Sequence, residues 1–138
     1  MTCQWLRNAG LLWLRVFAGL GIAWHGYGKI FAGDMAGFSR MVAHLGFPAP
    51  DFFAWAAALS ELVGGVCLVL GLATPLAGLM VVITMSVAAF LLHGADSFEV
   101  KELALCYWSM AGTLMLTGAG DWSLDAFFVG RVFGARRR

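Results

Sequence analysis

The chain has 138 residues, of which 61% are hydrophobic and only 12% are charged. An average soluble domain is about 45–50% apolar and about 25% charged, so this composition excludes an ordinary soluble domain and predicts an integral membrane protein. The net charge of +1 argues against a nucleic-acid partner, because proteins that bind nucleic acid carry a basic excess.

Four apolar segments are long enough, or nearly so, for helices that cross a membrane, which takes about 20 residues each. They span residues of about 9–28, 52–72, 75–93 and 102–117. The first contains Arg15 and ends in HGYGK (25–29) instead of a small-residue cleavage site, so we expect a retained helix and not a signal peptide. Residues 30–51 resemble a surface loop with a short interfacial helix. We therefore expect an all-α fold, a single transmembrane domain over residues 1–138 built as a four-helix bundle.

The positive charges of the loops predict an orientation. With four crossings, both termini lie on one side of the membrane. That side carries Arg7, Arg131, Arg136, Arg137 and Arg138, and the opposite side carries Lys29, Arg40 and Lys101. The positive-inside rule therefore places both termini in the cytoplasm.

Two charged residues lie deep in the predicted helices. A charge near the bilayer centre costs at least about 2.5–3.5 kcal/mol and usually has a partner inside the protein. Arg15 lies about six residues and Glu61 about eleven from the cytoplasmic ends of their helices, a difference in height of roughly 7 Å. Long side chains can bridge that difference, so we expect a buried Arg15–Glu61 ion pair that holds the helices together.

A second polar group lies near the outer ends of three helices: His25, Lys29, His93 and Glu102. Three interpretations remain open. In the first, the four residues are interfacial, with Lys29 reaching water. In the second, they bind or protonate a small ligand such as a quinone. In the third, His25, His93 and Glu102 bind a metal or haem. No HExxH or CxxCH spacing supports the third, so we expect no metal or haem.

An ordered set of residues resembles a known family. The set comprises Arg15 and Gly19, HGYGK (25–29), Phe31, Gly46 to Pro48, ELVGGVCLVLGLATP (61–75), His93, Glu102 and GAGDWSLD (118–125). With these the chain resembles the DoxX family of small four-helix membrane proteins. Relatives are similar to the membrane subunit of a thiosulfate:quinone oxidoreductase, and others are linked with thiol and oxidative-stress partners at the bacterial inner membrane.

The resemblance implies a quinone-binding subunit of a redox complex, with a separate protein as electron donor. Such a chain is at most a subunit of an enzyme. Related four-helix proteins that relay disulfides carry paired cysteines, and here Cys3, Cys67 and Cys106 show no CxxC spacing. The alternatives are a small-molecule transporter component, which needs a polar path through the membrane, and a structural scaffold without a cofactor. Besides membrane lipids as surroundings, the glycine-rich helix faces also suit a homodimer.

Overall fold

The computed structural model describes residues 2–128, and within them the chain forms helices and no strand. The long helices are α1 (Thr2–Tyr27), α3 (Pro50–Leu70), α4 (Thr74–Ser86) and α5 (Phe98–Thr117). The shorter helix α2 (Met35–His44) lies between α1 and α3 along the chain. Helices α1 and α4 continue into the π-helical segments η1 (Gly28–Ala32) and η2 (Val87–Leu92). The all-α prediction is therefore confirmed.

Glycine and proline define the turn between α3 and α4. Gly71 follows α3 with a φ of 65°, a left-handed conformation that glycine adopts without strain. Pro75 lies in the first turn of α4, where its missing N–H costs no helical hydrogen bond. Two predicted boundaries differ from the structure: the first helix begins at Thr2 and not near residue 9, and the last begins at Phe98 and not near residue 102.

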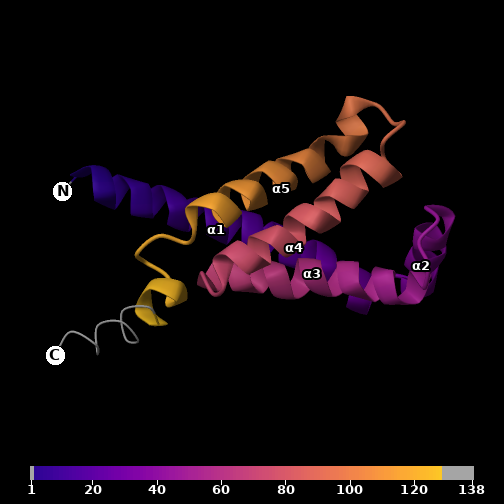
Figure 1. The fold of residues 1–138 in the computed structure, drawn as a ribbon, viewed down its shortest axis with the longest axis horizontal. Helices are drawn as coiled ribbons and strands as arrows, with labels where there is room; N and C mark the ends of the chain where they lie inside the picture. Colours follow the sequence, from indigo (N-terminus) through magenta and orange to yellow (C-terminus); the bar gives the residue numbers. More distant parts are fainter. Residues whose placement is uncertain (1, 129–138) are drawn as a thin grey trace.

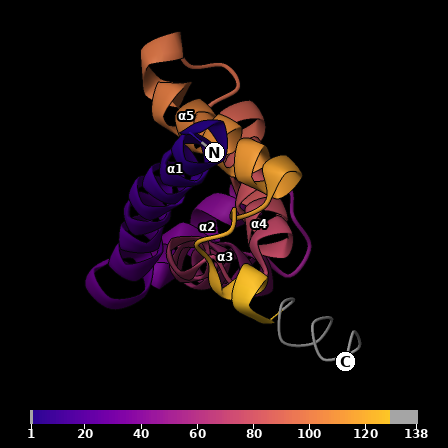
Figure 2. The ribbon, with the colours of Figure 1, turned by 90° about the vertical axis from the view of Figure 1, so that its left-hand side faces the viewer.

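The helices pack as two antiparallel pairs. Helix α1 packs along α3, helix α4 packs along α5, and contacts between α3 and α4 join the pairs. The pairs lie close together near the turn that joins α3 to α4 and diverge toward the end where α2 lies (Figure 1). Seen along the long axis, α2 lies across the far end of the other helices (Figure 2).

Glycines allow α1 and α3 to approach closely. A Cβ atom built on Gly65 would lie 2.5 Å from the backbone nitrogen of Ala23 and 2.6 Å from the carbonyl oxygen of Gly19. A Cβ on Gly26 would likewise overlap the backbone nitrogen of Leu62. These contacts fix the antiparallel register and place Arg15 beside Gly71, where a Cβ would overlap its guanidinium.

An apolar cluster fills the middle of the molecule. It is formed by Ile22, Leu68, Ala77, Val81, Met85, Ala111 and Leu114. Two helical stretches of the described chain, Pro50–Leu70 and Thr74–Leu92, are long and apolar enough to cross a membrane.

Candidate functional site

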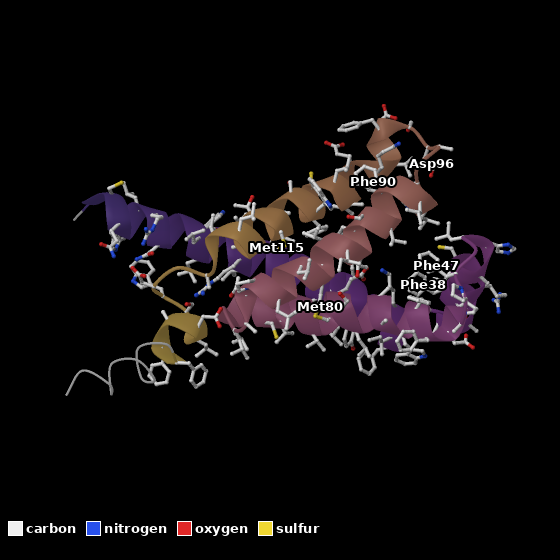
Figure 3. All side chains as sticks on the ribbon, in the orientation of Figure 1. Phe38, Phe47, Met80, Phe90, Asp96 and Met115 are labelled. Atoms are coloured by element: carbon white, nitrogen blue, oxygen red, sulfur yellow. The ribbon has the colours of Figure 1, made fainter. Side chains whose placement is uncertain are left out.

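A cavity of about 620 Å³ lies between the diverging helix pairs. Its walls are largely apolar and come from every helix, η2 included, and Lys29 of η1 also lines it. Phe38, Met41 and Val42 of α2, with Leu45 and Phe47 after it, line the α2 end. Figure 3 shows Phe38 and Phe47 on the side of α2 that faces the other helices. The cavity thus lies between the apolar cluster and α2.

An ion pair stands in this apolar wall. The Nζ of Lys29 donates to both carboxylate oxygens of Glu61, at 2.5 and 2.6 Å. The Glu61 side chain is 1% exposed and that of Lys29 is 32% exposed. The ammonium also lies 4.9 Å from the ring centroid of Phe38, within the range of a cation–π contact. Glu61 is therefore buried with its charge paired, while Lys29 reaches partway to the surface.

Other polar side chains line the same cavity. His25 of α1 meets the ring of Tyr107 of α5 edge to face, with centroids 5.7 Å apart. His93 follows η2, and its Nδ1 lies 2.8 Å from a carboxylate oxygen of Asp96. The cavity therefore combines apolar walls with hydrogen-bond donors from several elements, a combination typical of small-molecule sites.

The comparisons with known proteins bear on the same residues. A model of the DoxX family matches residues 10–94. The chain belongs to the DoxX family. No curated protein and no solved structure matches it. The match covers most of α1, all of α2, α3, α4 and η2, and His93, and so includes the Lys29–Glu61 pair. Family membership and the two apolar helices together indicate that this DoxX protein is a membrane protein.

The expected Arg15–Glu61 ion pair is wrong, because Glu61 pairs with Lys29. The prediction assumed that the ends of α1 and α3 are level. Instead α1 extends beyond α3, and Arg15 lies beside Gly71, ten residues from Glu61 along α3, or about 15 Å.

Arg15 finds its partners in the chain that follows α5. It is 3% exposed and donates hydrogen bonds to the carbonyl oxygens of Ala119, at 3.3 Å, and Trp122. The carboxylate of Asp125 is near enough to attract it. Asp125 in turn accepts from the backbone N–H groups of Ala73 and Thr74 at the start of α4, at 2.6 and 2.9 Å. Arg15 therefore holds the segment 118–125 against the helices and does not pair with Glu61.

The predicted ligand group is brought together only in part. His25, Lys29 and His93 line the cavity, whereas Glu102 is exposed on α5 and does not line it. Because the fourth helix begins at Phe98, Glu102 lies one turn into α5 and not at its start. Within residues 2–128, no three His, Cys, Asp or Glu side chains gather in a group that could hold a metal ion. The metal alternative, which needed His25, His93 and Glu102, has no such group.

The sequence reasoning missed three residues that line the cavity or hold the segment 118–125. Tyr107 lines the cavity, with its hydroxyl against Gly21 of α1; the signal available was a lone tyrosine within an apolar helix. Asn8 is 5% exposed and donates to Asp121 at 2.8 Å, but it lay outside the helix predicted from residue 9. Asp125 caps α4 from a distant part of the chain, which no local pattern signals.

Proposed function

We propose that this DoxX protein is a quinone-binding membrane subunit of a redox complex. The observation that carries the proposal is the paired charge of Lys29 and Glu61 in the wall of an apolar cavity of about 620 Å³. Ligand cavities usually measure about 300–1,000 Å³ and combine apolar walls with a few polar groups that orient the ligand.

The residues of the cavity fit a quinone. A quinone presents a flat apolar ring to the walls and two carbonyl oxygens to hydrogen-bond donors. Lys29 and His25, which line the cavity, can donate to those oxygens. When bound, the quinone would supply the redox chemistry, and the chain would bind and orient it.

His93 is suited to move a proton. Its Nδ1–H can donate to the carboxylate of Asp96, 2.8 Å away, which leaves Nε2 free to accept a proton and then to donate it. We propose that His93 exchanges a proton with one of the two ligand oxygens.

A transporter would need a polar path beyond the cavity. The apolar cluster that includes Leu68, Val81 and Leu114 stands between the cavity and the turn joining α3 to α4. The cavity is therefore closed toward that end. A channel would need a path open at both ends, so this supports a binding site.

For the membrane arrangement, we propose a bundle of α1, α3, α4 with η2, and α5 that crosses a bacterial inner membrane four times. The start of α1 and the segment 118–125 lie at one end of the molecule, joined by contacts of Asn8 and Arg15. Arg7 is at this end, so we propose that it faces the cytoplasm; Arg131, Arg136, Arg137 and Arg138 lie outside the described residues. We further propose a separate protein as electron donor. A homodimer or a scaffold role are the other outcomes to test.

The experiment measures quinone on the purified protein in lipid nanodiscs, by mass spectrometry of an organic extract and by titration with a short-chain quinone. Loss of a hydrogen bond from a charged donor costs about 1.5–3 kcal/mol, so Lys29→Met is expected to weaken binding at least about tenfold. His93→Ala is also expected to weaken quinone binding.

Matched controls come from the same end of the molecule. His44 lies on the exposed side of α2, Lys101 bonds to the carbonyl of Gly94, and neither lines the cavity. His44→Ala, Lys101→Met and Glu102→Gln are expected to bind quinone like the wild type. An extract without quinone combined with no saturable binding would overturn the proposal and leave the transporter and scaffold alternatives.

A further inference from the structure

A second, outer hollow adjoins the cavity where α1 passes into η1 and on toward α2. It has a volume of about 380 Å³ and is lined by Trp24, His25, Gly28, Lys29, Gly33, Asp34 and Phe38. Three of these residues, His25, Lys29 and Phe38, also line the main cavity. They therefore form a wall that is one side chain thick, with the cavity on one face and the outer hollow on the other.

The outer hollow is open at the surface, and three of its lining residues, His25, Lys29 and Asp34, are ionisable. Asp34 carries a carboxylate that is 68% exposed and pairs with Arg40 at 3.2 Å. Exposure then falls inward, from Asp34 through Lys29 at 32% to Glu61 at 1%. Ionisable groups thus lead from the surface, through the shared wall, to the buried carboxylate.

The cavity has a different border between α3 and α4. There the lining residues Phe53, Ala56, Met80 and Ile83 are themselves exposed; Figure 3 shows Met80 where α4 runs beside α3. All four are apolar, and they belong to the two helical stretches that are apolar enough to cross a membrane. Across the cavity, the contact of His25 with Tyr107 bridges α1 and α5.

We infer that the cavity has two entrances of opposite character. An apolar entrance between α3 and α4 admits a lipid-soluble ligand sideways from the bilayer. A polar entrance beside Lys29 connects the site to water on the α2 side. The inference rests on the proposed function for the identity of the ligand, but the entrances themselves are a property of the fold.

The polar entrance supplies protons to the site. When the proposed donor protein reduces the ligand, each ligand oxygen takes up a proton, one by way of His93 and the other from the Lys29 ammonium. The Lys29 amine then takes a proton that enters through the outer hollow. The Glu61 carboxylate lies 2.5–2.6 Å from the Nζ, so the proton taken up from the outer hollow restores the ion pair. Protons therefore enter from the α2 side of the membrane, away from the turn that joins α3 to α4.

The first test needs no ligand. Single cysteines are placed in a protein whose Cys3, Cys67 and Cys106 are serine, and each carries a nitroxide spin label in nanodiscs. Ser60→Cys puts the label in the cavity, whereas Leu59→Cys puts it on an exposed apolar position of α3 at nearly the same depth. Deuterium modulation of the signal in D₂O measures how far the label is exposed to water. The rate of collision with dissolved oxygen measures how far the label is exposed to lipid.

The expected result is water contact at Ser60→Cys well above that at Leu59→Cys, and oxygen collision at Ile83→Cys similar to that at Leu59→Cys. A Cβ on Gly28 has open space around it, so Gly28→Trp can fill the outer hollow and is expected to reduce water contact at Ser60→Cys. Ala57→Cys, which also faces the cavity, replaces Ser60→Cys if that variant does not fold. Equal water contact at the cavity and lipid positions overturns the polar entrance, and no oxygen collision at Ile83→Cys overturns the apolar one.

The second test uses a short-chain quinone delivered from the bilayer. Ala56→Trp narrows the apolar entrance and is expected to slow quinone association at least about tenfold, whereas Leu59→Trp is not. If quinone does not bind the wild type but the labels behave as expected, the proposed function fails and the two entrances stand. If quinone binds, and associates with Ala56→Trp as fast as with Leu59→Trp, the apolar entrance is wrong and the proposed function stands.

Discussion

Lys29 and Glu61 depend on each other in this structure. A buried carboxylate loses its hydration, and only a close, hydrogen-bonded partner compensates for that loss. Both Glu61 oxygens accept from the Lys29 ammonium, which returns to the carboxylate the charge and the donors that water would have supplied. Removing one partner therefore harms the fold more than removing both charges.

A double-mutant comparison tests this dependence. Lys29→Met leaves the Glu61 carboxylate buried and unpaired, a change that costs about 3–5 kcal/mol in buried pairs. We expect it to lower the midpoint of thermal unfolding in detergent, and Lys29→Met combined with Glu61→Gln to recover much of the loss. Lys101→Met serves as the control for a lysine outside the cavity. If the loss of stability in the double variant equals the sum of the losses in Lys29→Met and Glu61→Gln, the two charges do not depend on each other.

At the scale of elements, α1 and α3 approach each other so closely that their backbones are in contact. Gly65 faces Gly19 and Ala23 so closely that a Cβ would meet backbone atoms at 2.5 and 2.6 Å. Backbone atoms of a packed helix cannot move aside as a flexible side chain can. The small residues therefore set both the separation and the register of the two helices, and with them the position of Lys29 beside Glu61.

A pair of alanine substitutions measures this contact. Gly65→Ala is expected to destabilise the protein by about 1–3 kcal/mol, as overpacking does. Gly10→Ala has nothing within 4 Å of the new Cβ and is expected to be neutral or to stabilise α1 by about 0.5–1 kcal/mol, because alanine is the better helix former. The thermal midpoints of both variants in detergent provide the measurement. Equal midpoints would mean that α1 and α3 adjust without cost.

Sequence reasoning identified the helices but not their relative positions. Long apolar segments predicted four helices, and the polar residues His25, Lys29 and His93 of the cavity stood out because they interrupt apolar sequence. The partner of Glu61 was predicted wrongly because the sequence does not show that α1 extends past the end of α3. The π-helical turns of η1 and η2 were also not predicted. A π turn keeps the helical composition but turns less per residue, which changes where Lys29 projects.

At the scale of the whole molecule, the two ends differ in construction. One end contains the cavity, where the helix pairs diverge and α2 lies across them. At the other end, the segment 118–125 folds back and is fastened to α1 through Arg15 and Asn8, and to α4 through Asp125. The fold thus closes one end with polar contacts and leaves space at the other for a ligand.

The fold-back of 118–125 could not be predicted from sequence. The chain pattern GAGDWSLD (118–125) shows only that the last helix stops at its glycines. The partners of Asp121, the side chains of Gln4 and Asn8, lie more than a hundred residues away along the chain. Only the packing of α1 beside the end of α5 brings them together.

The Asp121 contacts predict how the fastened end responds to acid. Hydrogen bonds from Asn8 and then from Gln4 hold the pKa of Asp121 below its ordinary value near 3.8, with a smaller contribution from Arg7. Because the folded state favours the ionised carboxylate, its stabilisation is present in full above the ordinary pKa. The stabilisation is lost as the pH falls through the lower, folded-state pKa.

We therefore compare the thermal midpoints of the wild type and Asp121→Asn in detergent from neutral pH to about pH 2.5. The wild type is expected to unfold at the higher temperature, with a gap that stays constant down to about pH 4 and closes below it. Asn8→Ala removes the donor that lowers the Asp121 pKa most, so in that background the gap is expected to be smaller and to close at a higher pH. A gap that persists unchanged at the lowest pH would show that the side-chain shape of Asp121, and not its charge, holds the segment 118–125 against α1.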